Sequence, residues 1–178
     1  MKKIYCESEN ATIDLSSCIM QNIKQSSNIP AIICLGTNRI INDSLGPLVG
    51  TLLKQKYNCL AFVYGTMTDP ITAFNAKAAY SFVKKQHSDS SIILIDATIG
   101  RAEEHGIIKV AETERTFFLN RQIPVRADLC VTAVTGYNVC DFILQKTKTA
   151  FVGRMAEIIA YSFNNALFLK SLNQKLLI

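Results

Sequence analysis

Four short, uninterrupted apolar runs constrain the fold of this chain more than any other feature of its sequence. Residues 31–35 (AIICL), 59–64 (CLAFVY), 92–95 (IILI) and 129–134 (LCVTAV) contain almost no polar side chain. A strand with one face in water alternates apolar and polar residues, whereas a continuous apolar strand is buried on both faces. The runs therefore predict a mostly parallel sheet that is covered by helices on both sides.

Helical patterns separate these runs. Residues 12–25 carry apolar side chains at helical spacing before the first run, and residues 44–57 do so after it. Asp69 followed by Pro70 has the residue types of a helix N-cap and first helical position, which predicts a helix over 70–86. Two further helices are expected after the last run, over 137–147 and 150–170.

The stretch 100–128 lacks a helical pattern. It contains a short strand candidate at 106–111, which could lie at an edge of the sheet, and one or two strands that need not be parallel to the rest. The chain of 178 residues has no linker-like segment, so we expect a single domain with residues 1–28 as a helical N-terminal extension. The expected fold class is a three-layer α/β/α sandwich with a mixed, mostly parallel central sheet.

Composition and charge exclude several classes of protein. A hydrophobic share of 49% with 19% charged residues excludes a disordered chain. The net charge of +5 is spread over scattered lysines and arginines rather than a stripe, so we expect no nucleic-acid partner. The N-terminus lacks the apolar core of a signal peptide, and no apolar segment is long enough to span a bilayer. We therefore expect a cytoplasmic protein with no membrane partner.

Cysteines, histidines and glycines give no sign of a cofactor or metal site. The six cysteines form no C-x-x-C pair, which favours reduced thiols. Two histidines, His87 and His105, are too few for a His-rich metal centre. The glycines of the segment 36–50 match no nucleotide-binding loop, and the spacing of Gly46 and Gly50 favours close packing of a helix on the sheet. We expect neither cofactor nor metal.

Three acidic residues, Asp43, Asp69 and Asp96, follow three of the expected strands. Parallel sheets bind ligands at the carboxyl ends of their strands, where the winding changes direction. If the first strand lies between the second and the third, the first and third are neighbours about 4.8 Å apart, and Asp43 and Asp96 converge. Two adjacent carboxylates cannot both ionise cheaply, so one retains a proton. Such a pair can act as general acid and general base.

Each candidate also has a structural explanation. Asp43 lies where a helix N-cap is expected, and Asp is a favoured N-cap residue. Asp69 before Pro70 fits a cap better than a site. His105 precedes Gly106 in a loop and could approach the same crevice. We take Asp43 and Asp96 as candidate catalytic residues, and Asp69 and His105 as secondary candidates.

Four motifs resemble those of the YyaC-type sporulation proteins, which are related to the spore germination protease. They are the segments 36–47 (GTNRIINDSLGP), 63–70 (VYGTMTDP), 93–100 (ILIDATIG) and 131–136 (VTAVTG). The resemblance implies a hydrogenase-maturation-protease-like fold and an atypical aspartic-type endopeptidase whose catalytic pair falls on Asp43 and Asp96. It also implies a protein or peptide substrate, such as small acid-soluble spore proteins, and a location in the forespore or spore interior.

Two departures from these relatives qualify the expected activity. Hydrogenase maturation endopeptidases use a downstream histidine to sense nickel, and this chain has no histidine after His105. Related proteins carry a glycine-rich stretch before the final strand, whereas residues 116–124 (TFFLNRQIP) contain no glycine. A loop that admits a substrate backbone would therefore be altered. The alternative to an endopeptidase is a non-catalytic binding or scaffold protein of sporulation that keeps the fold. The sequence pattern does not indicate which oligomeric state the protein adopts.

Overall fold

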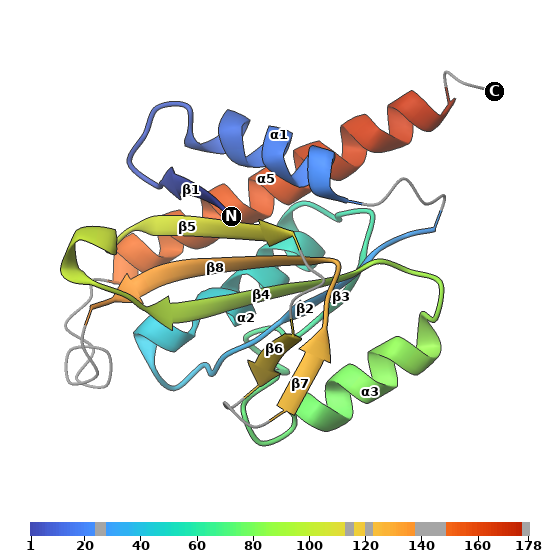
Figure 1. The fold of residues 1–178 in the computed structure, drawn as a ribbon, viewed down its shortest axis with the longest axis horizontal. Coiled ribbons are helices and arrows are strands. Elements are labelled where there is room, and N and C mark those ends of the chain that lie inside the picture. Colours follow the sequence, from blue (N-terminus) through green and yellow to red (C-terminus); the bar gives the residue numbers. More distant parts are fainter. Residues whose placement is uncertain (24–27, 113–115, 120–122, 138–148, 176–178) are drawn as a thin grey trace.

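The computed structural model describes residues 1–23, 28–112, 116–119, 123–137 and 149–175. A six-stranded sheet in the order β1-β5-β8-β4-β2-β3 forms the centre of the molecule (Figure 1). Each of the four predicted runs contains a strand of this sheet, and these four strands run parallel to one another. The first run lies between the second and the third, as predicted. The strands are β1 (Lys2–Tyr5), β2 (Ala31–Cys34), β3 (Phe62–Tyr64), β4 (Ile92–Ile99), β5 (Ile107–Glu112) and β8 (Leu129–Gly136).

Two strands at one end of the sheet run antiparallel to the others. β5 pairs with β8, and β1 pairs with β5. The predicted helical extension over residues 1–28 contains helix α1 (Ala11–Asn22), but it also contains β1, which belongs to the sheet and buries Ile4 between exposed neighbours. The edge position considered for residues 106–111 is wrong, since β1 covers the outer side of β5.

A second, two-stranded sheet contains the stretch that lacks glycine. β6 (Thr116–Leu119) and β7 (Ile123–Arg126) pair antiparallel, with Phe117 opposite Val125. In Figure 1 this pair projects from the main sheet on the side of the helix over residues 76–86. The stretch expected to be an altered loop therefore contains strand β6 and the first residues of its partner β7.

Helices cover both faces of the main sheet, which gives the expected α/β/α sandwich (Figure 1). Helices α1, α2 and α5 pack on one face and α3 packs on the other. None of the described helices is both long and apolar enough to cross a membrane. The predicted helix over 137–147 falls almost entirely outside the described residues. The helices are α1 (Ala11–Asn22), α2 (Leu45–Thr51) with its π-helical continuation η2 (Leu52–Lys56), α3 (Ala76–Gln86) and α5 (Thr149–Lys175), with short turns η1 (Ile41–Asp43) and η3 (Ala102–Glu104).

Alternation along β4 assigns its side chains to two separate cores. Ile93 and Ile95 belong to the larger core beneath α1, α2 and α5, whereas Leu94 belongs to the smaller core beneath α3. Successive side chains of a strand point to opposite faces. Asp96 is therefore on the α3 side of the sheet, above Leu94.

Two glycines bring α2 against the sheet, as the sequence predicts. A Cβ atom on Gly46 would lie 2.0 Å from the carbonyl oxygen of Leu35, and one on Gly50 would lie 1.9 Å from that of Gly65. Any side chain at either position would force the backbones apart. This close approach fixes the start of α2, and with it the preceding turn η1, against the end of β2.

None of the described cysteines forms a disulfide. They are Cys6, Cys18, Cys34, Cys59 and Cys130. Cys140 lies outside the described residues.

Candidate functional site

The loop that follows β2 folds tightly back on itself and returns Asp43 to the end of that strand. Gly36 has φ +140°, and its N–H donates to the carbonyl of Ile71 at 2.9 Å. The N–H of Thr37 donates to the carbonyl of Asp43 at 3.1 Å, which closes the loop. A Cβ at position 36 would lie 2.0 Å from that carbonyl oxygen, so only glycine allows this closure.

Asp43 does not occupy the N-cap position of α2. The helix begins at Leu45, and its N-cap residue is Ser44, whose hydroxyl donates to the carbonyl of Ile41 at 2.7 Å. Asp43 instead ends the turn η1, where it is half-buried. The capping interpretation of Asp43 therefore does not hold.

Asp96 lies inside β4, one residue beyond the point where β2 stops. Cys34, the last residue of β2, is opposite Ile95, and Asp96 itself is opposite Thr132 of β8. The expectation that the strand closes at Asp96 is wrong, because β8 continues alongside and extends the hydrogen-bonded ladder to Ile99. One carboxylate oxygen of Asp96, Oδ1, accepts the N–H of Ala97 at 2.8 Å.

The two carboxyl groups interact electrostatically. Burial, and to a smaller extent the negative charge of Asp43, raise the pKa of Asp96 to about 8, while the N–H of Ala97 opposes the shift. Burial also raises the pKa of Asp43, opposed by the N–H of Thr37. Near neutral pH the pair therefore holds a proton, with the proton favoured on Asp96 and the charge on Asp43.

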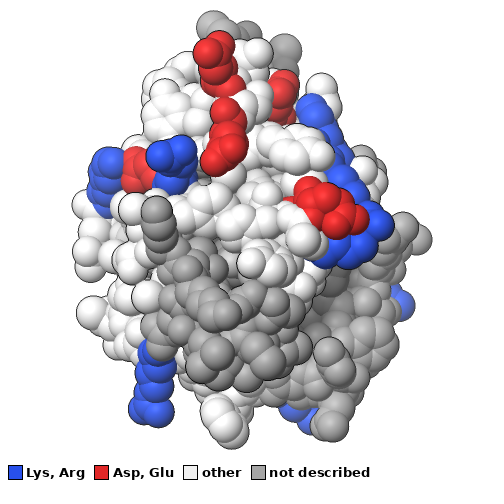
Figure 2. Space-filling view, turned by 90° about the vertical axis from the view of Figure 1, so that its left-hand side faces the viewer, with Lys and Arg blue, Asp and Glu red and all other residues white. Residues whose placement is uncertain are grey.

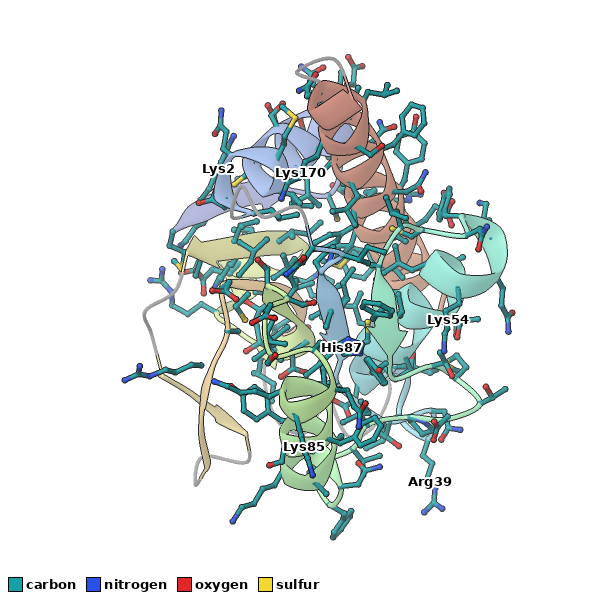
Figure 3. The ribbon with its side chains drawn as sticks, turned by 90° about the vertical axis from the view of Figure 1, so that its right-hand side faces the viewer. Lys2, Arg39, Lys54, Lys85, His87 and Lys170 are labelled. Atoms are coloured by element: carbon teal, nitrogen blue, oxygen red, sulfur yellow. The ribbon has the colours of Figure 1, made fainter. Side chains whose placement is uncertain are left out.

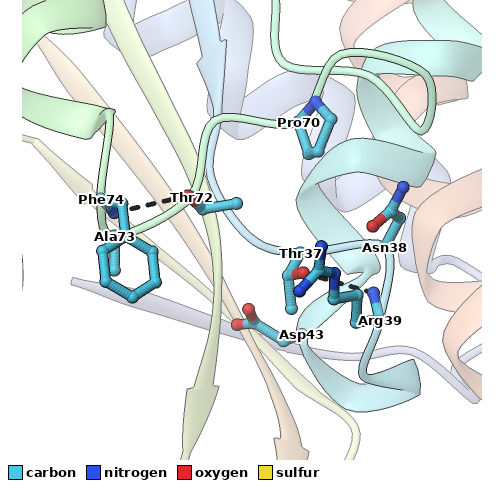
Figure 4. A pocket seen from close by; sticks show the side chains of 8 residues that line it. All are labelled: Thr37, Asn38, Arg39, Asp43, Pro70, Thr72, Ala73 and Phe74. Atoms are coloured by element: carbon cyan, nitrogen blue, oxygen red, sulfur yellow. Dashed lines mark hydrogen bonds between the residues drawn. The ribbon is translucent and has the colours of Figure 1, made fainter.

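A pocket of about 460 Å³ opens beside Asp43 (Figure 4). In Figure 4 the carboxyl group of Asp43 lies between the segment that carries Thr72 and Phe74 and the loop that carries Arg39. The ring of Phe74 is fully exposed at the rim. The volume falls within the range of small-ligand and side-chain pockets. The lining residues are Thr37, Asn38, Arg39 and Asp43 from the loop after β2, and Pro70, Thr72, Ala73 and Phe74 from the segment after β3.

Asp69 lies in a turn outside the pocket lining and caps no helix. Its N–H donates to the hydroxyl of Thr66 at 3.1 Å, and its side chain is exposed. The helix predicted from residue 70 begins only at Ala76, with Asn75 at the N-cap position. The residues between cannot be helical because Ile71 forms a parallel bridge with Leu35 at the edge of the sheet.

His105 is not brought to the carboxylate pair. Its ring stacks on Phe151 of α5 at a centroid distance of 4.4 Å and meets Tyr137 edge-on at 5.9 Å. Helix α5 covers the face of the sheet opposite to that of Asp96. Among the described residues, the groups that shift the pKa values of Asp43 and Asp96 do not include His105.

A family model described as "Protein of unknown function (DUF1256)" matches residues 3–162. The chain belongs to the DUF1256 family. It is also 29% identical over 155 residues to a Bacillus subtilis (strain 168) protein named "Uncharacterized protein YyaC", a match that covers 84% of this chain and 76% of that protein. No solved structure matches the chain. The YyaC-type resemblance predicted from the four motifs is thereby confirmed.

The matched part of this DUF1256 chain contains both carboxylates and the whole pocket lining. Sequence reasoning found the carboxylates but missed Arg39 and Phe74, because no local pattern shows that the segment after β3 returns to the loop after β2. It also missed Cys130, whose thiol pKa is raised by burial and by the charge of Asp96. The parallel register of β4 and β8 places Cys130 opposite Leu94, two residues before the pair formed by Asp96 and Thr132, and register cannot be read from either strand alone.

Charged side chains of both signs are interleaved on the side of the molecule where β4 and β8 end (Figure 2). The described part of the DUF1256 chain contains no group of three or more His, Cys, Asp or Glu side chains that could hold a metal ion. The chemistry available at the described site is therefore that of two coupled carboxyl groups beside a pocket.

Proposed function

We propose that this DUF1256 chain is an endopeptidase of the aspartic type, with Asp43 and Asp96 as its catalytic pair. The observation that carries the proposal is the electrostatic coupling of these two carboxyl groups, which come from the loop after β2 and from the middle of β4. A pair that holds one proton and one negative charge at neutral pH offers a general base and a general acid together.

The mechanism follows from the protonation of the pair. Asp43, the carboxylate, accepts a proton from a water molecule, whose oxygen attacks the carbon of the peptide bond. Asp96, the carboxylic acid, donates its proton to the carbonyl oxygen, and a tetrahedral diol forms. Asp43 then passes its proton to the amide nitrogen, Asp96 recovers a proton from the diol, and the C–N bond breaks to give an acid and an amine.

The pocket supports a polypeptide as substrate. Asp43 lies in its lining, so a side chain bound in the pocket would hold the adjoining backbone near the pair. The YyaC-type resemblance points to small acid-soluble spore proteins and to the forespore or spore interior. We therefore propose these proteins as the first substrates to test.

The test is to incubate the purified chain with small acid-soluble spore proteins and to identify fragments by mass spectrometry. Asp43→Asn and Asp96→Asn should each lower kcat by about 10²–10⁴-fold, because an amide cannot exchange the proton that general acid–base catalysis requires. The rate of the unaltered chain should show a bell-shaped pH dependence that belongs to the pair. Since no metal is proposed, chelators should leave the rate unchanged.

Asp69→Asn is the matched control, because it alters an exposed carboxyl group in a turn outside the pocket lining. Cleavage that survives in Asp96→Asn would show that the aspartic mechanism is wrong. If no spore protein is cleaved and the two Asn variants change only its binding, the chain is a non-catalytic binding or scaffold protein.

A further inference from the structure

A buried hydrogen bond joins the end of β8 to the turn that carries Asp43. The hydroxyl of Thr135 donates to the carbonyl oxygen of Asn42 at 2.9 Å, and both residues are 0% exposed. This carbonyl belongs to the peptide unit that links Asn42 to Asp43. A hydrogen bond in the protein interior is electrostatically stronger than one in water. The bond therefore holds the backbone directly before Asp43 against the end of β8.

The loop between β2 and α2 has an exposed part and a buried part. Arg39 is exposed, and in Figure 3 its side chain extends away from the rest of the molecule. Ile41 packs on the larger core, and Asn42 is fully buried. The turn η1 lies against β4 and β8. The part of the loop that ends in Asp43 is therefore the part that is attached to the sheet.

Thr135 is the extra residue of a β-bulge. Thr98 of β4 is opposite Val134 of β8. The next residue of β4, Ile99, is opposite Gly136, so β8 has one residue more than its partner over this interval. The carbonyl groups of Val134 and Gly136 accept N–H bonds from the segment that follows β4, at 2.9 and 3.0 Å, so the backbone on both sides of Thr135 is held in place. Bulges redirect a side chain and occur frequently beside active sites.

The same strand holds both members of the aspartate pair. Asp96 is opposite Thr132 in the ladder between β4 and β8. Asp43 is tied through its neighbour Asn42 to Thr135, which lies three residues further along β8. Loss of the Thr135 bond would therefore leave Asp96 in its ladder but loosen the turn that carries Asp43.

We propose that Thr135 is a positioning residue of the aspartate pair, and that its hydroxyl group fixes the carboxyl group of Asp43 relative to that of Asp96. The inference rests on the proposed endopeptidase function, because the catalytic pair is what Thr135 positions. Its effect passes through the backbone of Asn42. A misplacement of about 1 Å can lower the rate of an enzyme about 10²-fold. The alternative is that the hydroxyl only satisfies a buried carbonyl group and contributes to stability alone.

Three variants separate these two roles. Thr135→Val removes the hydroxyl and keeps the branched shape of the side chain, whereas Thr135→Ser retains the hydroxyl. Ser162→Ala is the matched control, because Ser162 is also 0% exposed and its hydroxyl donates to the carbonyl of Thr12 at 3.2 Å, which joins α5 to α1. Thr135→Val and Ser162→Ala thus each remove a hydroxyl that bonds to a carbonyl of another element, but the bond of Ser162 does not involve the turn of Asp43.

The readouts are the pKa of Asp96, followed by carbon NMR, and kcat for cleavage of a spore protein. Thr135→Val should lower the pKa of Asp96 by about half or more of the shift that Asp43→Asn produces, because a displaced Asp43 charge opposes ionisation of Asp96 less. It should also lower kcat about tenfold or more. Thr135→Ser should keep both values close to those of the unaltered chain, and Ser162→Ala should lower the Tm without changing either value. If Thr135→Val does not fold, Thr135→Ala removes the same hydroxyl and should give the same shift.

Two outcomes would show that the role of the hydroxyl is only structural. The first is a Thr135→Val chain that is less stable but keeps the pKa of Asp96 and kcat of the unaltered chain. The second is an equal shift of the Asp96 pKa in Ser162→Ala, which would indicate a general loosening of the fold.

The same measurements distinguish this inference from the proposed function. If Thr135→Val lowers the pKa of Asp96 and Thr135→Ser does not, but the unaltered chain cleaves no spore protein, the positioning role stands and the endopeptidase proposal fails. If Asp43→Asn lowers the pKa of Asp96 and Thr135→Val does not, the pair stands and the positioning role is wrong. If Asp43→Asn itself leaves the pKa of Asp96 unchanged, there is no coupled pair to position and both proposals fail.

Discussion

The charge of Asp43 raises the pKa of Asp96, so a carboxyl group at the end of a loop is coupled to one inside a strand. The topology of the sheet makes this coupling possible. β2 stops at Cys34, β4 continues beyond it, and the space above the end of β2 is where the loop returns Asp43. Neighbouring parallel strands of unequal length are thus what brings the two residues together.

The first prediction concerns this coupling. Asp43→Asn should lower the pKa of Asp96, because the variant removes a negative charge that disfavours ionisation of its neighbour. The value should still lie above that of an ordinary aspartate, since burial is the larger cause. Carboxyl titration followed by carbon NMR checks this. Asp69→Asn should leave the pKa of Asp96 unchanged. If this control lowers the pKa of Asp96 as much as Asp43→Asn does, the coupling is not specific to Asp43 and Asp96.

The second prediction concerns stability and pH. The folded state keeps a proton on Asp96 up to about pH 8, whereas an unfolded aspartate loses it near about pH 4. Between these values the folded state binds more protons, so the contribution of Asp96 to the free energy of unfolding falls as pH rises. Asp96→Asn removes this contribution. Relative to the unaltered chain, the variant should therefore gain stability as pH rises from about 5 to about 9 in urea unfolding experiments. A parallel pH dependence of the two proteins would show that Asp96 ionises normally.

How much the sequence could predict depends on whether a feature is local. β2 and β4 could be predicted because burial on both faces leaves a continuous apolar run. β1 could not, since one buried residue, Ile4, between exposed neighbours gives too weak a pattern. The extension of β4 past Asp96 is set by the length of its partner β8, which is a tertiary property.

The candidate site divides in the same way. Asp43 and Asp96 could be found because each follows a recognisable buried run, and the strand order then brings the runs together. The pocket could not be predicted, because it needs the bridge between Leu35 and Ile71 that holds the two loops side by side. His105 was a plausible candidate by its place in the chain, but its ring packs on Phe151, on the other face of the sheet.

The third prediction concerns Glu104, a buried carboxylate at the end of η3. Lys3 and Lys109 bind its carboxylate oxygens at 2.8 and 3.0 Å, and with the N–H of Arg101 they lower its pKa to about 2. A lowered pKa stabilises the fold above the unfolded value of about 4.5, and this stabilisation is lost as pH falls toward 2. Glu104→Gln should therefore destabilise the chain at neutral pH. As pH falls from about 4.5 to about 2, the variant should lose less stability than the unaltered chain.

Urea unfolding over the acid range measures this effect. Glu103→Gln is the control, since Glu103 is exposed and its ion-pair partner among the described residues is Arg101, at 3.2 Å. Exposed ion pairs contribute about 0–1 kcal/mol, so the control should change stability little. If Glu104→Gln unfolds with the stability of the control variant, the bonds from Lys3 and Lys109 contribute nothing to the fold.

The last prediction concerns the approach of α2 to the sheet. Gly46→Ala would place a Cβ atom 2.0 Å from the carbonyl oxygen of Leu35, so the helix or the strand must move. Overpacking of this kind costs about 1–3 kcal/mol. Because Asp43 lies two residues before the start of α2, the movement should also displace its carboxyl group and lower the pKa of Asp96 by weakening their coupling. Gly153→Ala in α5 is the control, since a Cβ there meets nothing within 4 Å, and the change should stabilise the chain by about 0.5–1 kcal/mol. Thermal unfolding together with the Asp96 titration distinguishes the two variants. If the Gly46→Ala chain is as stable as the Gly153→Ala chain and the pKa of its Asp96 is unchanged, close packing of α2 does not position the pair.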